Sequence, residues 1–220
     1  MRASASGTAA RRGRPAAASR EDVLAAASRR YLRGERVDVQ SIAAELGVGR
    51  TTIYRWFGTR EELIGEVLPQ VTKPLLERAR AEARGRGAHK LVDTFDRFNR
   101  SLVAAPALRQ FVEREREAAV RIITSGAGNV QRRNVEMVTE VIEAEVRAGA
   151  YDPPVEPATL GYAIVRLAEA FIFNESATGM GDSVDRLREV EAALLGATAA
   201  AASLDGGRGT SVRRTAPARR

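Results

Sequence analysis

Residues 37–63 read VDVQSIAAELGVGRTTIYRWFGTREEL and predict two short amphipathic helices joined by a glycine turn, followed by the start of a third helix. Asp38 is a favourable N-cap residue, because its carboxylate can accept a hydrogen bond from the amide of Gln40 or Ser41. Gly47 is expected to end the first helix, since glycine adopts a positive φ without steric strain. This pattern is typical of a helix-turn-helix unit.

The second helix of the pair has an inward and an outward face. Ile53 and Phe57 are four residues apart and give the helix an apolar inward stripe. The outward face carries guanidinium, hydroxyl and phenol groups, which packing does not require but which match the hydrogen-bonding edges of bases in the major groove of DNA. These outward residues are Arg50, Thr51, Thr52, Tyr54 and Arg55.

The third helix begins with a capping box, formed by Thr59 and Glu62. Such a start places backbone amides and the Arg60 side chain together at a helix N-terminus, where a phosphate can bind. The whole stretch therefore predicts binding to DNA.

Residues 20–66 resemble the N-terminal DNA-binding domain of the TetR family of bacterial transcriptional repressors. Two positions depart from the family pattern: Gly49 replaces the usual Ser at the N-cap of the second helix, and Arg60 replaces the usual Lys. Both changes are mild, because glycine is tolerated at an N-cap and arginine keeps the positive charge. The residues that carry the resemblance are Ile42, Ala43, Gly47, Val48, Thr52, Ile53, Tyr54, Phe57 and Arg60.

The resemblance implies two kinds of DNA contact when it is carried over residue by residue. For Tyr54 and Trp56 the alternative is that they are half-buried aromatic residues, and for Arg50 and Arg55 it is a solvated face. The residues implied near bases are Gln40, Arg50, Thr51, Tyr54 and Arg55, and those implied near phosphates are Thr52, Trp56 and Arg60.

Two arginine-rich tails carry the positive charge of the chain. The first 20 residues and the last 15 each contain five arginines and no acidic residue, which leaves −3 of the overall +7 for the residues between them. Such compositions cannot bury a core, so we expect a disordered arm at 1–18 and a disordered basic tail at 205–220. Within RRGRP, Arg12 and Arg14 are expected to enter a DNA minor groove; a transit peptide is the alternative.

The ordered remainder predicts an all-α fold, because a period of 3.6 residues recurs and no segment alternates as a strand does. We expect a helix-turn-helix DNA-binding domain of three helices at 19–67 and an α-helical effector-binding and dimerisation domain at 68–204. Ser19 and Asp22 should cap a first helix. Its predicted inward residues are Val23, Leu24, Ala27, Tyr31 and Leu32.

The second domain should consist of long helices. A helix that begins at Arg60 must be kinked or split by Pro69 and Pro74. The further helices are expected at about 91–104, 106–124, 130–147, 157–177 and 183–202.

A homodimer is expected on two grounds. One helix-turn-helix unit reads only a few base pairs, so two units about 34–36 Å apart are needed for a usable palindromic operator in double-stranded DNA. In the TetR family, moreover, the last two long helices of each subunit form a four-helix bundle. The implied seam is Leu160, Ile164, Leu167 and Phe171 with Val184, Leu187, Val190 and Leu194, and an intramolecular core is the alternative for half of these.

The second domain also resembles the ligand domain of QsdR-type TetR regulators, which are linked to quorum-signal and lactone degradation. The similar segments are FVEREREAAVRIITS at 111–125, the pair Val130 and Gln131, and AIVRLAEAFIFNESATG at 163–179. Arg166 and Glu169 lie three apart on an apolar helix, where they form a structural ion pair or bind the polar end of an effector. The predicted effector pocket consists of Phe95, Phe98, Phe111, Met137, Tyr162, Arg166, Glu169 and Phe173, although core filling is the alternative for its aromatic members.

Other classes of function receive little support. The single histidine, His89, is expected to be exposed, and the sequence predicts no catalytic residue, metal site or cofactor. No apolar run approaches the length of a membrane span, and the absence of cysteine suits a reducing cytoplasm, where the protein would associate with the nucleoid.

The sequence thus predicts a ligand-responsive homodimeric repressor. The alternative is an architectural DNA-binding protein that uses its basic tails without regard to sequence. Two further alternatives, a transcriptional activator and an enzyme whose active site lies in the second domain, receive less support from the sequence.

Overall fold

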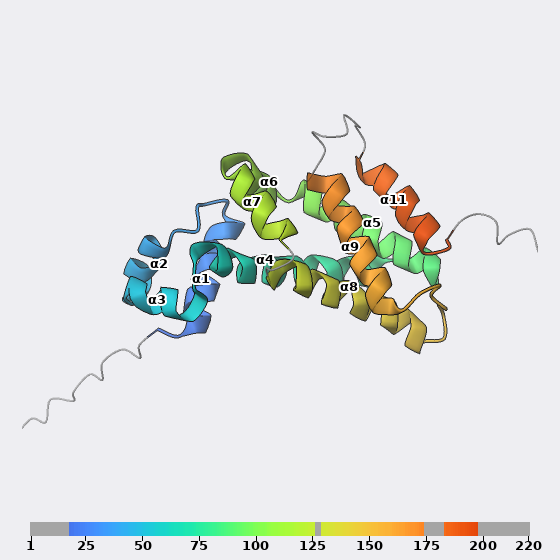
Figure 1. The fold of residues 1–220 in the computed structure, drawn as a ribbon, viewed down its shortest axis with the longest axis horizontal. Coiled ribbons are helices and arrows are strands. Elements are labelled where there is room, and N and C mark those ends of the chain that lie inside the picture. The colour runs from blue at the N-terminus through green and yellow to red at the C-terminus, as the bar shows by residue number, and fades with distance from the viewer. Residues whose placement is uncertain (1–17, 126–128, 174–182, 198–220) are drawn as a thin grey trace, which may run out of the picture.

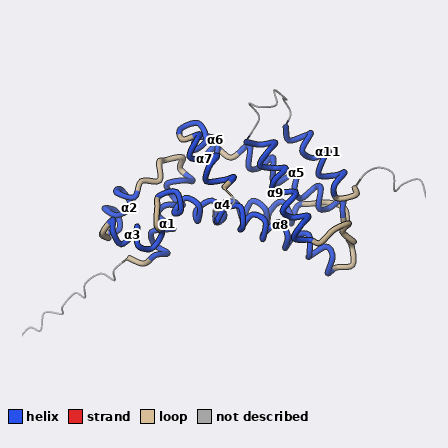
Figure 2. The backbone as a smooth tube through the Cα atoms, in the orientation of Figure 1, coloured by secondary structure: helices blue, strands red, loops and turns tan. Residues whose placement is uncertain are grey.

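The computed structural model describes residues 18–125, 129–173 and 183–197, and all regular structure in these ranges is α-helical, as expected (Figures 1 and 2). None of the described helices is long and apolar enough to cross a membrane. In chain order the helices are α1 (Arg20–Leu32), α2 (Val39–Leu46), α3 (Arg50–Phe57), α4 (Arg60–Glu82), α5 (Ala88–Ala104), α6 (Pro106–Arg114), α7 (Arg116–Thr124), α8 (Asn129–Arg147), α9 (Pro157–Phe173) and α11 (Ser183–Leu194).

The predicted N-terminal caps of α1, α2 and α4 and the predicted end of α2 are confirmed. Asp38 accepts a hydrogen bond of 2.8 Å from the backbone amide of Ser41, and Gly47 ends α2 with a φ of 67°. Both capping boxes, at the starts of α1 and α4, are complete. The prediction that Leu32 faces inward was wrong, because Leu32 is 61% exposed. The four other inward residues predicted for α1 are buried.

Helix α4 is continuous and connects the two ends of the molecule (Figure 1). Of the two expected effects of Pro69 and Pro74, a kink or a split, the split is contradicted, because one helix runs through both prolines. Each proline removes one backbone donor from the helix, but the side of α4 that contains Pro69 is buried and packs against α1 and α8. This tertiary packing offsets the poor helix propensity of proline.

The segment predicted as one helix at 106–124 is instead two helices. Glu115 separates α6 from α7 with φ −137° and ψ 47°, outside the helical region. At the other end of the chain, α11 is shorter than predicted and is followed by Gly196, which has a φ of 73°. The predicted continuations over 174–177 and 198–202 lie outside the described residues.

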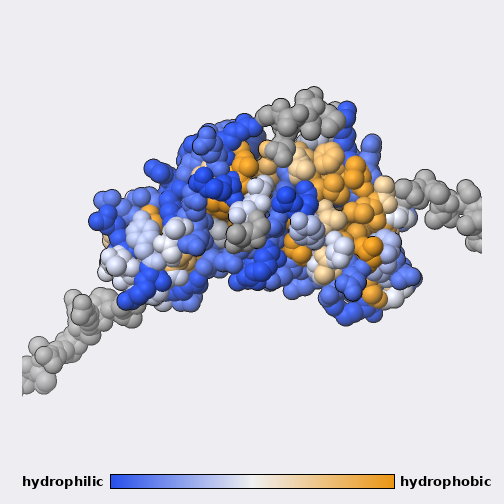
Figure 3. Space-filling view, viewed as in Figure 1, coloured by the Kyte–Doolittle hydropathy of each residue, from blue (hydrophilic) through white to orange (hydrophobic). Residues whose placement is uncertain are grey.

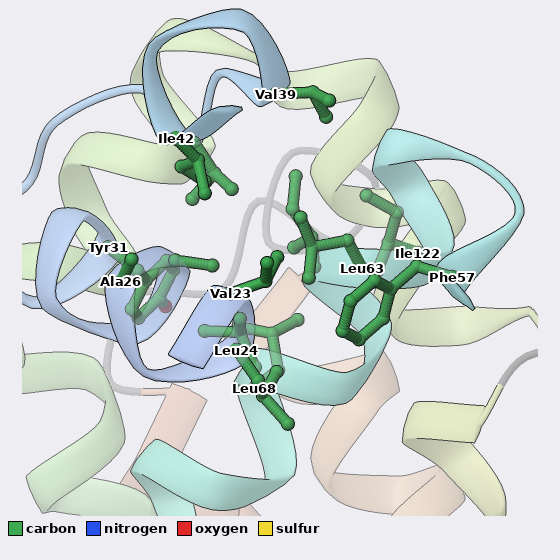
Figure 4. Close-up of a cluster of buried hydrophobic side chains, with 14 of the residues drawn as sticks. Val23, Leu24, Ala26, Tyr31, Val39, Ile42, Phe57, Leu63, Leu68 and Ile122 are labelled. Carbon is green, nitrogen blue, oxygen red and sulfur yellow. The ribbon is translucent and has the colours of Figure 1, made fainter. Parts of the chain in front are cut away.

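Two hydrophobic clusters form the core. The first joins α1, α2, α3 and the first half of α4 to α6, α7 and the start of α8, so that Ile122 of α7 belongs to the same cluster as Val23 and Leu63 (Figure 4). The second lies between α4, α5, α8, α9 and the end of α11, around Phe95, Ile142 and Leu160. The predicted domain boundary at 67–68 falls within α4, in a region where the first cluster continues from one side to the other.

Candidate functional site

Helix α3 presents a polar face to solvent. Its inward residues Ile53 and Phe57 are buried, and they fix the helix on the first cluster. Arg50, Thr51 and Arg55 are exposed, and Thr52 is half-buried. Gly49 caps the helix with extended backbone and provides no side-chain hydrogen bond.

The two aromatic residues of this face lie in different environments. Tyr54 is 47% exposed, whereas Trp56 is half-buried and packs against the first cluster. Gln40 on α2 is exposed as well. Arg12 and Arg14 of the predicted arm lie outside the described residues.

Arg60 is placed differently from the expectation of a phosphate contact. Its guanidinium donates one hydrogen bond to each carboxylate oxygen of Glu115, both 2.7 Å long, and its Nε donates to the carbonyl of Val37 at 2.6 Å. The bidentate geometry suits the planar arginine fork. A partner 55 residues away in the chain is not visible in a local motif, which explains the difference.

Further polar contacts join α4 and its neighbours to α6 and α7. Arg121 of α7 forms an ion pair with Glu61, and Arg114 of α6 donates to the carbonyl of Gly34. These contacts and the shared cluster place α6 and α7 directly against the unit that carries α3, which consists of α1, α2, α3 and the first half of α4.

A cavity of about 120 Å³ is lined mainly by α4, α5, α6, α8, α9 and α11, with contributions from the end of α1 and from α7. Its wall is mostly aliphatic and aromatic. The side chains that can offer hydrogen bonds along it are Tyr31, Thr72, Asn99, Asn134, Glu169 and Glu191. A small number of polar groups on an apolar wall is typical of small-molecule sites.

The structure brings five of the predicted pocket residues together and leaves three apart. Phe111 packs edge-to-face on Tyr31 at 5.8 Å in the first cluster, and Tyr162 is 51% exposed. Arg166 is partly exposed and does not line the cavity. The five residues that do line it are Phe95, Phe98, Met137, Glu169 and Phe173.

Glu169 forms the ion pair with Arg166 that the sequence allowed, and it also lines the cavity. Its Oε2 accepts a hydrogen bond of 2.8 Å from Arg166, and Gln131 lies 3.5 Å from the same oxygen. Its Oε1 lies buried, and no residue in the described part of the chain donates a hydrogen bond to it. Burial raises the pKa of Glu169, while Arg166 opposes that shift. The ion pair is therefore present, and the carboxylate also belongs to the cavity wall.

The predicted dimer seam separates into two groups. Leu160, Ile164 and Leu187 are buried in the core of their own chain, which corrects their assignment to the seam. Val190 is 39% exposed, and the remaining members are half-buried. Apolar residues gather on the surface over α9 and α11 (Figure 3).

Two family models match the chain over consecutive regions. The model for bacterial regulatory proteins of the tetR family matches residues 34–67, and the model for the tetracyclin repressor-like C-terminal domain matches residues 86–196. The chain belongs to the TetR family. It is accordingly a helix-turn-helix DNA-binding transcription regulator.

Solved structures of TetR-family proteins share this fold. The transcriptional repressor QsdR of R. erythropolis is 29% identical, with a TM-score of 0.76 over 80% of this chain and 94% of that one. The repressor AlkX of Dietzia sp. strain DQ12-45-1b, implicated in n-alkane biodegradation, is 19% identical, with a TM-score of 0.56 over 82% and 95%. FadR of Thermus thermophilus in complex with lauroyl-CoA is 17% identical, with a TM-score of 0.53 over 91% and 99%. Comparison with curated proteins gives no match.

Two polar residues of this TetR-family cavity were missed at the level of sequence. Glu191 is fully buried, and Asn99, which is 3% exposed, donates to its Oε1 at 3.2 Å. Each lies four residues after a buried apolar residue, Leu187 or Phe95, and so shares the inward stripe of its helix. A polar residue at that register was the signal that could have revealed them.

Burial strongly affects the Glu191 carboxyl. The pKa of Glu191 is raised to about 8, because the effect of burial and the smaller effect of the charge of Asp96 outweigh the hydrogen bond from Asn99, which lowers it. The described cations near Asp96, Arg100 and Arg188, form ion pairs with Asp96 and none with Glu191. Glu191 therefore faces the cavity without a charged partner among the described residues.

Proposed function

We propose that this TetR-family regulator is a homodimeric repressor, which binds a palindromic operator through two α3 faces and leaves it when a small molecule fills the cavity. The observation that carries the proposal is the path of α4. Its first turn contacts the unit that carries α3, and further along Leu68, Val71 and Leu76 line the cavity. A ligand that moves the cavity wall therefore acts on the same helix that supports the DNA-binding face.

The proposed DNA contacts follow from exposure on α2 and α3. Tyr54 has no packing role that accounts for its position, and Arg50 and Arg55 provide donors of the kind that bind guanine edges. Trp56 fits a phosphate contact from a half-buried position, and Arg60 is omitted because Glu115 occupies its guanidinium. The proposed contacts are Gln40, Arg50, Thr51, Thr52, Tyr54, Arg55 and Trp56, with Arg12 and Arg14 of the arm in the minor groove.

Repression and release rest on likeness to the solved regulators. QsdR and AlkX are described as repressors, and FadR of Thermus thermophilus was solved with lauroyl-CoA. We propose an amphipathic or apolar effector for this chain, bound by Phe95, Phe98, Met137, Glu169 and Phe173. The likeness to QsdR makes lactones and related quorum-type signals one candidate class.

The proposed mechanism is a shift between two populations of the dimer. The effector must bind more tightly to the form of the dimer in which the two helix-turn-helix domains are wrongly spaced for the operator. Affinity for the operator then falls by the same factor by which operator binding weakens the effector. Because its operator lies on the chromosome, we propose that the protein is cytoplasmic and associates with the nucleoid.

Dimerisation is proposed through α9 and α11. Four apolar residues of these helices stay partly exposed to solvent within one chain: Leu167, Phe171, Val190 and Leu194. A helix pair from each subunit would cover this surface. Val190→Glu places a charge in the proposed seam, and sedimentation analysis should then show monomers while the helix content stays unchanged.

The experiment that tests the function is selection of bound duplexes from random DNA, followed by affinity measurement at physiological salt. A selected operator should bind about 10³-fold more tightly than a scrambled duplex. Arg50→Ala or Tyr54→Ala should remove most of that preference. If deletion of residues 1–18 and 206–220 abolishes binding while these two variants leave it intact, the protein is an architectural DNA binder instead.

A further inference from the structure

We infer that the cavity takes an amine: a molecule with an apolar body and a protonated nitrogen that forms an ion pair with Glu191. This inference rests on the proposed role of the cavity as the effector site, and it specifies the chemistry of the effector. It is carried by the acidic groups that the cavity wall presents and by the absence of a described cation inside it.

The first observation is the composition of the polar wall. Two of its side chains, Glu169 and Glu191, are carboxyl groups, and they come from α9 and α11, which pack against each other. Arginine and lysine are missing from the described lining. An anionic head group such as a phosphate or a carboxylate would find no described cation along this wall.

The second observation is that these carboxyl groups retain unused hydrogen-bonding capacity. The Oε1 atom of Glu169 has no hydrogen-bond partner among the described residues, although this side chain is almost entirely buried. Among the described residues, Glu191 is hydrogen-bonded only by the amide of Asn99, at 3.2 and 3.5 Å. Buried acceptors without partners are unfavourable, and a ligand that donates hydrogen bonds removes that penalty.

A cation fits Glu191 better than a neutral donor does. The neighbouring charged group Asp96 is itself acidic and is neutralised by Arg100 and Arg188, so no described cation compensates Glu191. Glu169, in contrast, already has Arg166. Glu191 can become a buried carboxylate only where an opposite charge pairs with it, and an ammonium group in the cavity would supply that charge.

The high pKa of Glu191 adds a chemical consequence. At neutral pH the empty site holds Glu191 mostly as the uncharged acid, since burial disfavours its anion. Binding of an alkylammonium ion forms the ion pair and sends the carboxyl proton to solvent, so the ligand keeps its charge and one proton is released per site. The remainder of the ligand lies against the ring of Phe95 and its apolar neighbours.

The test is calorimetry on the full-length protein without DNA, with octylamine, 1-octanol, octanoate and γ-octalactone as probes of similar size. Octylamine should bind about tenfold or more tightly than 1-octanol, because hydrogen bonds to charged groups are stronger than neutral ones. The heat of octylamine binding should depend on the ionisation enthalpy of the buffer as proton release requires, and the heat of octanol binding should not.

Glu191→Gln keeps the shape of the acid and removes its charge. It should reduce the affinity for octylamine to that for 1-octanol, abolish proton release and leave octanol binding unchanged. Glu189→Gln is the matched control, since Glu189 is exposed on the same helix and does not line the cavity, and it should change nothing. The comparison of probes on the unmodified protein stays decisive if Glu191→Gln fails to fold.

The inference is overturned if octylamine does not bind, if octanol, octanoate or the lactone binds as tightly, or if Glu191→Gln leaves octylamine binding unchanged. These results are separable from failure of the proposed function. A lactone that binds and releases the operator would remove the inference about amines and leave the function standing. Octylamine that binds through Glu191 without weakening operator binding would support the ligand class and contradict the proposed release.

Discussion

Arg60 and Glu115 connect the first turn of α4 to the junction between α6 and α7 by two hydrogen bonds of 2.7 Å. Both side chains are about four-fifths buried, at 20% and 18% exposure. The α6–α7 break therefore coincides with a contact to the unit that carries α3, and α6 also lines the cavity through Ala107 and Leu108.

Removal of this ion pair should destabilise the protein. Glu115→Gln is expected to lower the free energy of unfolding by about 1.5–3 kcal/mol, because it leaves the Arg60 guanidinium partly buried without a counter-charge. Urea unfolding measures the change. Glu61→Gln is the matched control on the same turn of α4: its pair with Arg121 is exposed, so the loss should stay below about 1 kcal/mol. Equal effects of the two substitutions would show that the Arg60 pair has no special role.

The same contact should affect communication between cavity and DNA. We expect α6 and α7 to transmit ligand binding to the helix-turn-helix domain. Glu115→Gln should then reduce the factor by which an effector weakens operator binding. The affinity of the effector for the free protein should change little. Fluorescence anisotropy of a labelled operator with and without effector measures that factor. An unchanged factor would mean that the signal runs through α4 alone.

Stability should depend on pH through Glu191. Its pKa rises from an ordinary 4.5 to about 8 in the folded protein, so the folded state binds a proton more tightly than the unfolded state does. The free energy of unfolding should therefore fall as the pH rises from about 5 to about 8, by up to about 1.4 kcal/mol per pH unit from this group. Burial of Glu169 acts in the same direction.

Glu191→Gln isolates that contribution. The variant cannot ionise at this position, so its unfolding free energy should decline less over the same pH range and should exceed that of the unmodified protein at the alkaline end. Parallel pH profiles for the two proteins would show that Glu191 is not buried as described.

Gly161 should be required for the close packing of α8 against α9. A Cβ atom at this position would lie 2.5 Å from Oγ1 and 3.2 Å from the backbone nitrogen of Thr139. Gly161→Ala is therefore expected to destabilise the protein by about 1–3 kcal/mol, as overpacking typically does. In a Thr139→Ala background part of this loss should be recovered, because the nearest atom is gone. Additive effects of the two changes in thermal unfolding would contradict the predicted contact.

Local sequence patterns were sufficient for most of the DNA-binding unit. The caps at Asp38 and Thr59, the glycine at the end of α2 and the inward pair Ile53 and Phe57 all depend on residues within one or two helical turns. Those interactions have characteristic spacings, and a single sequence displays them.

The features that the sequence did not reveal depend on partners far along the chain. Arg60 matches a phosphate-binding position, but its guanidinium is held by Glu115, 55 residues later. Leu160 and Leu187 have the periodicity of a dimer seam, yet the chain uses both in its own core. Periodicity identifies the buried face of a helix and does not say whether that face is covered by the same chain or by another.

The cavity residues illustrate the same limit for polar groups. Aromatic residues were the obvious candidates, and Phe111 and Tyr162 proved to lie elsewhere, in the first cluster and at the surface. Glu191 and Asn99 face each other across 92 residues of sequence, and only the packing of α5 against α11 brings them together.

The most direct test compares the affinity of the full-length protein for its selected operator with its affinity for a scrambled duplex, at physiological salt. The comparison is made for the unmodified protein and for the double variant that combines Arg50→Ala and Tyr54→Ala. We predict a preference of about 10³-fold or more for the operator, and its loss in the double variant with the fold intact. Equal affinity for both duplexes, or a preference that survives in the double variant, would contradict the assignment of α3 as the DNA-binding face.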